Sequence, residues 1–174
     1  MKAIQVLALS SIVFLLVFSC SKDTAKPVAE TNGINLAGAS GSSKSWMLTS
    51  VSYTKNGGGA NSLALDPCVL DNVYKFTNNS TQDFIQTEGA LKCNSADSTV
   101  TESGNWALTN DGKNLVVEGV WFDDLSQETV YQYIFTAFGE ATVTQITATT
   151  FVISYSFTNS TGDIYVVTST FTKV

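Results

Sequence analysis

Short runs of alternating apolar and polar residues recur about every ten residues from residue 45 to the end of the chain. Such alternation places every second side chain on one face of an extended strand, and no window shows the period of a sustained amphipathic helix. Turn-forming residues at 110–113 and 159–162 predict two tight hairpins. The pattern predicts eight or nine strands, at 45–55, 72–78, 82–88, 103–109, 113–121, 129–137, 141–148, 150–158 and 163–173.

The alternation also assigns one face of the strands to the core. The residues expected to point inward are Tyr74, Phe76, Trp106, Leu108, Leu115, Val117, Phe151, Ile153, Tyr155 and Phe157. Polar residues such as Lys75, Asn105 and Glu118 alternate with them. A meander of this many antiparallel strands removes its exposed edges best by closing. We therefore expect an all-β barrel, with a two-sheet β-sandwich as the alternative.

The amino terminus follows a different pattern. Lys2 precedes an apolar run over residues 4–18, which is shorter than the roughly 20 apolar residues that a membrane-spanning helix needs. This arrangement is typical of a signal peptide. The run ends in LVFSC at 16–20, which resembles the lipobox of bacterial lipoproteins. The resemblance implies cleavage after residue 19 and acylation of Cys20, which would attach the chain to a membrane.

The residues after Cys20 favour the outer membrane. Ser21 is not the aspartate that would resemble the inner-membrane retention signal of proteobacteria. Lys22 and Asp23 resemble the export tag of surface lipoproteins of the Bacteroidetes. We expect an outer-membrane lipoprotein that faces either the periplasm or the cell surface.

Residues 20–43 are rich in small and polar residues and contain no aromatic residue. Such a segment buries too little apolar surface to offset the entropy of ordering it, so we interpret it as a lipidated flexible tether. Residues 44–174 are long enough for one hydrophobic core and too short for two. The chain is thus divided into a signal peptide (1–19), a tether (20–43) and a single domain (44–174).

Several motifs of that domain carry a family resemblance. They are Trp46 in the first strand, the sequence DPCVLDNVYKF at 66–76, Cys93, and the sequence GNWAL at 104–108. Together they resemble the lipocalin-like lipoproteins of the Bacteroidetes over about residues 44–174. The resemblance implies a lipocalin-like barrel that binds a small apolar or amphipathic molecule.

Two cysteines, Cys68 and Cys93, are left once Cys20 is acylated. An exported protein meets an oxidising compartment, where such pairs form disulfides, so we expect a bond between them. The alternative is a metal site, but the chain has no histidine and no third thiol in the domain, so a zinc site would lack its usual ligands. We expect no metal and no cofactor.

Composition bears on the class of partner. The chain contains no histidine, the commonest general base, and all nine of its cationic side chains are lysines, so we expect no enzyme and no catalytic residues. Its net charge of −6 opposes binding to nucleic acid. Asp123, Asp124 and Glu128 form an acidic cluster, which we interpret as a solvated turn rather than a calcium or catalytic site. The oligomeric state stays open.

Aromatic residues suggest a ligand site. The chain has 10 Phe, 6 Tyr and 3 Trp, and residues 130–138 are apolar on both faces of their expected strand. Large aromatics in a small β domain either fill the core or line a pocket. We place a ligand near Trp106 and Tyr155, because Trp and Tyr offer an apolar body and a polar group. The alternative is an envelope or surface protein whose loops contact another protein or a glycan.

Overall fold

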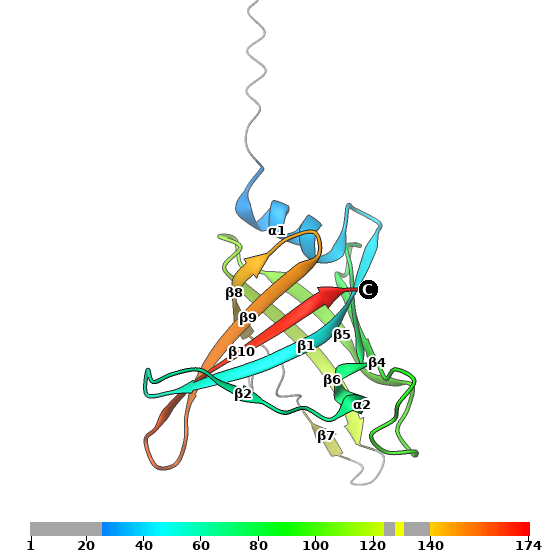
Figure 1. Cartoon of the computed structure of the whole chain (residues 1–174). Helices are drawn as coiled ribbons and strands as arrows, with labels where there is room; N and C mark the ends of the chain where they lie inside the picture. Colours follow the sequence, from blue (N-terminus) through cyan, green and yellow to red (C-terminus); the bar gives the residue numbers. More distant parts are fainter. Residues whose placement is uncertain (1–25, 124–127, 131–139) are drawn as a thin grey trace, which may run out of the picture.

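A computed structural model describes residues 26–123, 128–130 and 140–174 of the chain, with the side chains of 119–139 left out (Figure 1). Two helices and ten strands lie within these residues. In chain order they are α1 (Val28–Ala37), β1 (Ser43–Lys55), β2 (Asn61–Leu63), α2 (Pro67–Leu70), β3 (Val73–Thr77), β4 (Asp83–Thr87), β5 (Val100–Leu108), β6 (Asn114–Asp123), β7 (Glu128–Val130), β8 (Glu140–Ile146), β9 (Thr150–Thr158) and β10 (Ile164–Lys173).

The strands form a closed antiparallel barrel, so the expected all-β barrel is confirmed and the sandwich alternative is wrong. Eight of the described strands follow one another around the ring in the order β1, β3, β4, β5, β6, β8, β9 and β10. The ring closes where β1 pairs with β10, in a register that runs from Trp46 opposite Lys173 to Lys55 opposite Tyr165. Closure gives both outer strands of the meander a hydrogen-bonded neighbour, which removes its edges.

Local turn chemistry forms the two predicted hairpins. Asp111 Oδ1 accepts hydrogen bonds from the backbone N–H of Lys113 at 3.0 Å and from the Thr109 hydroxyl at 2.7 Å. At the β9–β10 turn, Asn159 Oδ1 accepts from the backbone N–H groups of Thr161 and Asp163. These side-chain oxygens accept hydrogen bonds from backbone N–H groups of the turns that have no partner on a neighbouring strand. They thereby hold each turn in one conformation, which fixes the register of the two strands it joins.

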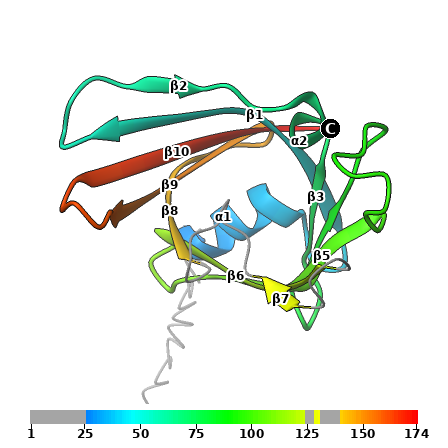
Figure 2. The same ribbon diagram turned by 90° about the horizontal axis from the view of Figure 1, so that it is seen from below.

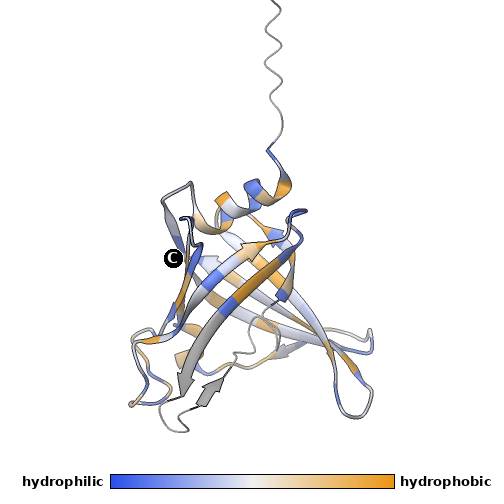
Figure 3. Ribbon diagram, turned by 180° about the vertical axis from the view of Figure 1, so that it is seen from behind, coloured by the Kyte–Doolittle hydropathy of each residue, from blue (hydrophilic) through white to orange (hydrophobic). Residues whose placement is uncertain are grey.

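The barrel interior is filled by aromatic and aliphatic side chains on the inward register of the strands. The ring centroid of Phe76 lies 5.1 Å from that of Phe84, 6.1 Å from that of Trp106 and 6.0 Å from that of Phe151. Phe151 in turn stacks on Phe171 with centroids 4.5 Å apart. In Figure 3 apolar and polar residues follow one another along the strands, as this inward and outward alternation requires.

The predicted inner face is mostly confirmed. Its buried members are Tyr74, Phe76, Trp106, Leu115, Val117, Phe151 and Ile153, and its partly buried members are Leu108 and Tyr155. Phe157 is the exception, because 46% of its surface is exposed. It keeps the inward register of β9 but lies near the end of the projecting β9–β10 hairpin, beyond the enclosed core (Figure 1).

The expectation of a flexible tether over residues 20–43 is wrong for its described part. Residues 28–37 form α1, which lies across one end of the barrel and is seen through the ring of strands in Figure 2. Leu36 and Ala37 are fully buried. The indole N–H of Trp46 donates to the Leu36 carbonyl at 2.8 Å, and Lys44 Nζ donates to the Asn35 carbonyl at 2.7 Å. The barrel end supplies the apolar contacts that the segment's own composition does not predict.

The sequence also missed two small elements, β2 and α2, which lie between β1 and β3. A third difference concerns the strand expected at 129–137. Its first two residues belong to β7, which pairs with β6, and residues 131–137 lie outside the described part of the chain. β6 pairs with β8 only over residues 114–116. That expected strand is therefore not described as a member of the ring.

Candidate ligand site in the barrel interior

The two ends of the barrel differ. α1 covers the end where β5 finishes at Leu108. The opposite end, called the far end below, is where the β1–β2 and β9–β10 hairpins project and where the loop after β4 lies (Figure 1). Any ligand site inside the barrel must therefore be sought toward the far end, away from the helix.

Three polar side chains occupy inward positions on neighbouring strands and form what we call the polar row: Tyr74 on β3, Gln86 on β4 and Glu102 on β5. Tyr74 stands directly opposite Gln86, and Gln86 directly opposite Glu102. Tyr74 is fully buried, Gln86 is 1% exposed and Glu102 is 5% exposed. The row therefore places polar groups in a core whose other side chains are mostly apolar.

The polar row is short of hydrogen-bond donors. Within the described residues, Gln86 Oε1 and Glu102 Oε2 are buried and have no hydrogen-bond partner. None of the ion pairs formed by the described residues includes Glu102. Residues 119–139 contain no lysine, arginine or histidine, so that segment cannot supply a cationic side chain. Buried polar groups are normally paired, so these two acceptors require an explanation.

Burial without a counter-ion changes the pKa values of the two titratable groups in the polar row. Removal from water raises the pKa of the Glu102 carboxyl from 4.5 to about 7. Burial, and then the nearby charge of Glu102, raise the pKa of the Tyr74 hydroxyl above its usual value. The interior thus holds a carboxyl group whose charge is unfavourable unless a cation or a strong donor approaches it.

Aromatic side chains line the inner face of β1, β9 and β10 toward the far end. We call Tyr53, Tyr155, Phe157 and Tyr165 the aromatic row. The rings of Phe157 and Tyr165 are stacked with centroids 5.2 Å apart, and those of Tyr155 and Phe157 lie 6.3 Å apart. Tyr53 and Tyr165 are separated by 6.0 Å. Because these rings are only partly buried, they present apolar surface to a guest.

The structure places the two predicted ligand residues in different surroundings. Tyr155 belongs to the aromatic row. Trp106 is 3% exposed, contacts Phe76 in the core, and donates its indole N–H to the Thr77 carbonyl at 3.0 Å. Trp106 borders a pocket of about 480 Å³ between α1 and the barrel. Its indole N–H, the only polar group of the side chain, is already bonded to Thr77 and is not free to bind a ligand in that pocket.

Sequence reasoning missed Gln86 and Glu102. Gln86 lies two residues from Phe84 on a predicted strand, 82–88, to which no inward residue was assigned. Glu102 lies four residues from the inward Trp106, just before the predicted strand at 103–109. Assigning the alternation of Phe84 and extending that of Trp106 by two steps would have placed an amide and a carboxyl among core aromatics. A charged residue at a strand position where the alternation expects an apolar one was the sequence signal that could have identified Glu102.

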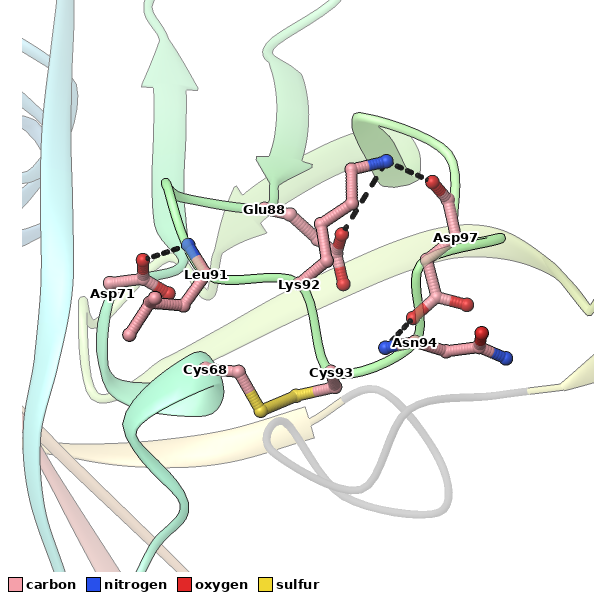
Figure 4. Close-up of a disulfide and its surroundings, with 8 residues drawn as sticks. All are labelled: Cys68, Asp71, Glu88, Leu91, Lys92, Cys93, Asn94 and Asp97. Carbon is pink, nitrogen blue, oxygen red and sulfur yellow. Dashed lines mark hydrogen bonds and ion pairs between the residues drawn. A yellow bond between two sulfur atoms is a disulfide. The ribbon is translucent and has the colours of Figure 1, made fainter.

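The expected disulfide is confirmed. Cys68 in α2 is bonded to Cys93 in the loop after β4, with Cα atoms 5.2 Å apart (Figure 4). Asp71 Oδ2 accepts a hydrogen bond from the backbone N–H of Leu91 at 2.8 Å, which also ties the two segments together. Lys92 Nζ reaches the Asp97 carbonyl and lies 4.0 Å from a carboxylate oxygen of the buried Glu88. Burial is the main cause that raises the pKa of Glu88.

Other expected sites lie partly or wholly outside the described residues. Cys20 and the signal peptide are outside them, as is Asp124 of the acidic cluster. Asp123 and Glu128 pair across the β6–β7 ladder, but their side chains are not described. Within the described residues, no three His, Cys, Asp or Glu side chains gather as metal ligands. No helix of that part combines the length and apolar character needed to cross a bilayer.

Comparison with protein-family models finds no match for this chain, and comparison with curated proteins finds none either. The lipocalin-like resemblance of its motifs therefore remains an expectation. The function of the protein therefore rests on the geometry of the barrel.

Proposed function

We propose that this protein is an exported lipoprotein, anchored in the outer membrane through acyl chains on Cys20, whose lipocalin-like barrel binds a small apolar or amphipathic molecule toward its far end. The aromatic row is the observation that carries the binding proposal. Phe157 and Tyr165 stack on the inner face of projecting strands, and Phe157 leaves 46% of its surface exposed. Exposed apolar rings on an inner face are expected where a guest covers them.

The position of α1 supports an orientation for this anchored barrel. Only residues 21–27 separate Cys20 from the helix, and even a fully extended chain of that length spans about 25 Å. The end of the barrel covered by α1 therefore faces the membrane in our proposal. The far end then points away from the bilayer, toward a ligand that arrives through water.

Binding is tested by titrating the protein with fatty acids, sterols and quinones while following tryptophan fluorescence. We expect a saturable change with at least one of these classes. Phe157→Ala should weaken that binding at least tenfold. Ile164→Ala serves as the matched control, because Ile164 is equally apolar, 52% exposed, and on the outward register of β10. Absence of saturable binding to these classes and also to small cationic or neutral aromatic molecules would overturn the proposed function.

Anchoring is tested separately with Cys20→Ala. We expect the wild-type protein to fractionate with the outer membrane and to carry an acylated Cys20 in mass spectrometry. The variant should remain uncleaved or be released. An unmodified Cys20 in the mature wild-type protein would contradict the lipoprotein proposal and leave the binding proposal untouched.

A second candidate function is contact with another envelope protein or a glycan. It is favoured by the exposed apolar side chains of the projecting hairpins, Leu63, Ile164 and Val166, which point away from the barrel interior or lie on β2. In that case, a crosslinker placed at residue 164 in whole cells should give one discrete adduct, and Val166→Asp should remove it. Failure of every ligand titration together with that adduct would favour this function over the first.

A further inference from the structure

Two side chains of the polar row present unpaired acceptors to the barrel interior. Gln86 Oε1 and Glu102 Oε2 are two of the six buried side-chain atoms of the described residues that have no assigned hydrogen-bond partner, and both are acceptors on inward side chains of adjacent strands. The carboxyl of Glu102 in addition carries a negative charge when ionised. A guest that completes this row must therefore bring donors, and its binding is strongest when it also brings positive charge.

The described residues do not supply that charge. Lys44 donates to the Asn35 carbonyl, Lys55 pairs with Asp163 at 2.7 Å, and Lys92 reaches the Asp97 carbonyl. The remaining described lysines are Lys26 in an ion pair with Glu30, Lys113 beside Asp111, and the exposed Lys75 and Lys173. Since residues 119–139 contain no cationic side chain, the described barrel leaves Glu102 without a counter-ion.

We infer that the ligand of this barrel carries an ammonium group, with the Glu102 carboxylate as its counter-ion and the Gln86 side-chain carbonyl as a second acceptor. The inference rests on the proposed binding function and names the chemical class of the guest. A primary ammonium has three N–H donors, enough for both orphan acceptors. A carboxylate or phosphate group would instead meet the Glu102 charge, so anionic amphiphiles should be disfavoured.

The arrangement of the ring suits such a molecule. The ring has eight strands, and β9 lies four positions from β4. These two strands therefore stand diametrically opposite each other. The polar row lies on β3, β4 and β5, and the aromatic row lies on β9, β10 and β1, of which β1 is the neighbour of β3. The aromatic rings on β9 therefore face the acceptors across the barrel, and Tyr53 on β1 lies on the strand beside them. An amine with an apolar or aromatic body would match both groups of side chains.

The test uses three water-soluble probes that share one body: 2-phenylethylamine, 2-phenylethanol and 3-phenylpropanoate. Their affinities for the full-length mature protein are measured at pH 8 by calorimetry. We expect the amine to bind at least tenfold more tightly than the alcohol, and the carboxylate to bind most weakly. Because this ranking is measured on the wild-type protein, it does not depend on whether any variant folds.

Glu102→Gln, which keeps the shape of the side chain and removes its charge, should lower the affinity for the amine at least tenfold and so abolish its advantage over the alcohol. Glu118→Gln is the matched control, since Glu118 is exposed on the neighbouring strand β6.

Equal binding of amine and alcohol, or an amine preference that survives Glu102→Gln, would overturn the ammonium inference. If the ammonium inference fails but the alcohol binds, and Phe157→Ala weakens the binding of the alcohol, the proposed function stands without this inference. Binding of none of the three probes would overturn the inference; failure of the fatty-acid, sterol and quinone titrations as well would overturn the function.

Discussion

The indole N–H of Trp46 donates a 2.8 Å hydrogen bond to the backbone carbonyl of Leu36, and both side chains are completely buried. The contact joins the first barrel strand to α1. It shows that part of the segment before residue 44 belongs to the folded domain. Residues that carry neither charge nor aromatic rings thus complete the core at one end of the barrel.

Truncation of Leu36 should therefore cost as much as a core mutation. We expect Leu36→Ala to lower the free energy of unfolding by about 2 to 5 kcal/mol, because a fully buried leucine loses its contacts and leaves a cavity. Urea denaturation measures the change. Val28→Ala, at the exposed start of the same helix, should change it by less than about 0.5 kcal/mol. Equal and small effects of both substitutions would show that α1 does not stabilise the barrel.

The buried carboxyl of Glu102 should make stability depend on pH. Its pKa is about 7 in the folded protein and 4.5 as the reference value, so between these values the folded state holds more protons than the unfolded state. Stability from this group is accordingly lost as pH rises from 4.5 to 7, and the penalty is complete above 7. Glu102→Gln should thus raise the free energy of unfolding at pH 8 by roughly 2 to 3 kcal/mol and change it little at pH 4.

Urea denaturation of wild type and variant at both pH values checks this prediction. Glu118→Gln, on an exposed side chain, should show no such pH-dependent difference. Burial raises the pKa of Glu88 as well, so a weaker slope of the same sign should persist in the Glu102 variant. An identical effect of Glu102→Gln at pH 4 and pH 8 would contradict the burial of an ionisable group.

Loss of the Cys68–Cys93 bond should destabilise the far end of the barrel. We expect Cys68→Ser and Cys93→Ser each to lower the free energy of unfolding by about 2 to 5 kcal/mol. The double variant should be no worse than either single one, because the bond is already absent in each. Thiol counting under denaturing conditions gives a direct check: free thiols at both positions of the exported protein would refute the bond.

Gly89 should not accept a side chain. A Cβ atom at this position would clash with the backbone carbonyl oxygen of Asp71, which cannot move as a flexible side chain could. We expect Gly89→Ala to lower the free energy of unfolding by about 1 to 3 kcal/mol. Gly59→Ala is the matched control, because no atom lies within 4 Å of its Cβ position, and it should be nearly neutral. A neutral Gly89→Ala would show that the loop after β4 moves away from Asp71 at little cost.

Much of the barrel was predictable because its information is local. The two-residue period of Phe151, Ile153 and Tyr155 assigns an inner face without reference to any other strand. The side-chain acceptors Asp111 and Asn159 mark their turns in the same way. Pairing of Cys68 with Cys93 followed from their number and from the expected compartment.

The candidate site was only partly predictable. Tyr155 was identified from its aromatic character, but the sequence joined it to Trp106, which the fold places in the core beside Phe76 and near α1. Which residues face one another inside a barrel depends on strand order and register, and these are fixed only when β1 closes against β10.

The sequence by itself determined most of the strands and of their inward faces, the hairpins and the cysteine pair, because each depends on neighbours along the chain. Only the tertiary structure decided that Leu36 is core, that Gln86 stands opposite Glu102, and that Gln86 Oε1 and Glu102 Oε2 have no hydrogen-bond donor among the described residues. The reason is physical: burial and hydrogen-bond satisfaction depend on what surrounds a side chain in space. A carboxyl group that looks ordinary in the sequence becomes a candidate binding group once the closed barrel removes it from water and leaves it without a cation.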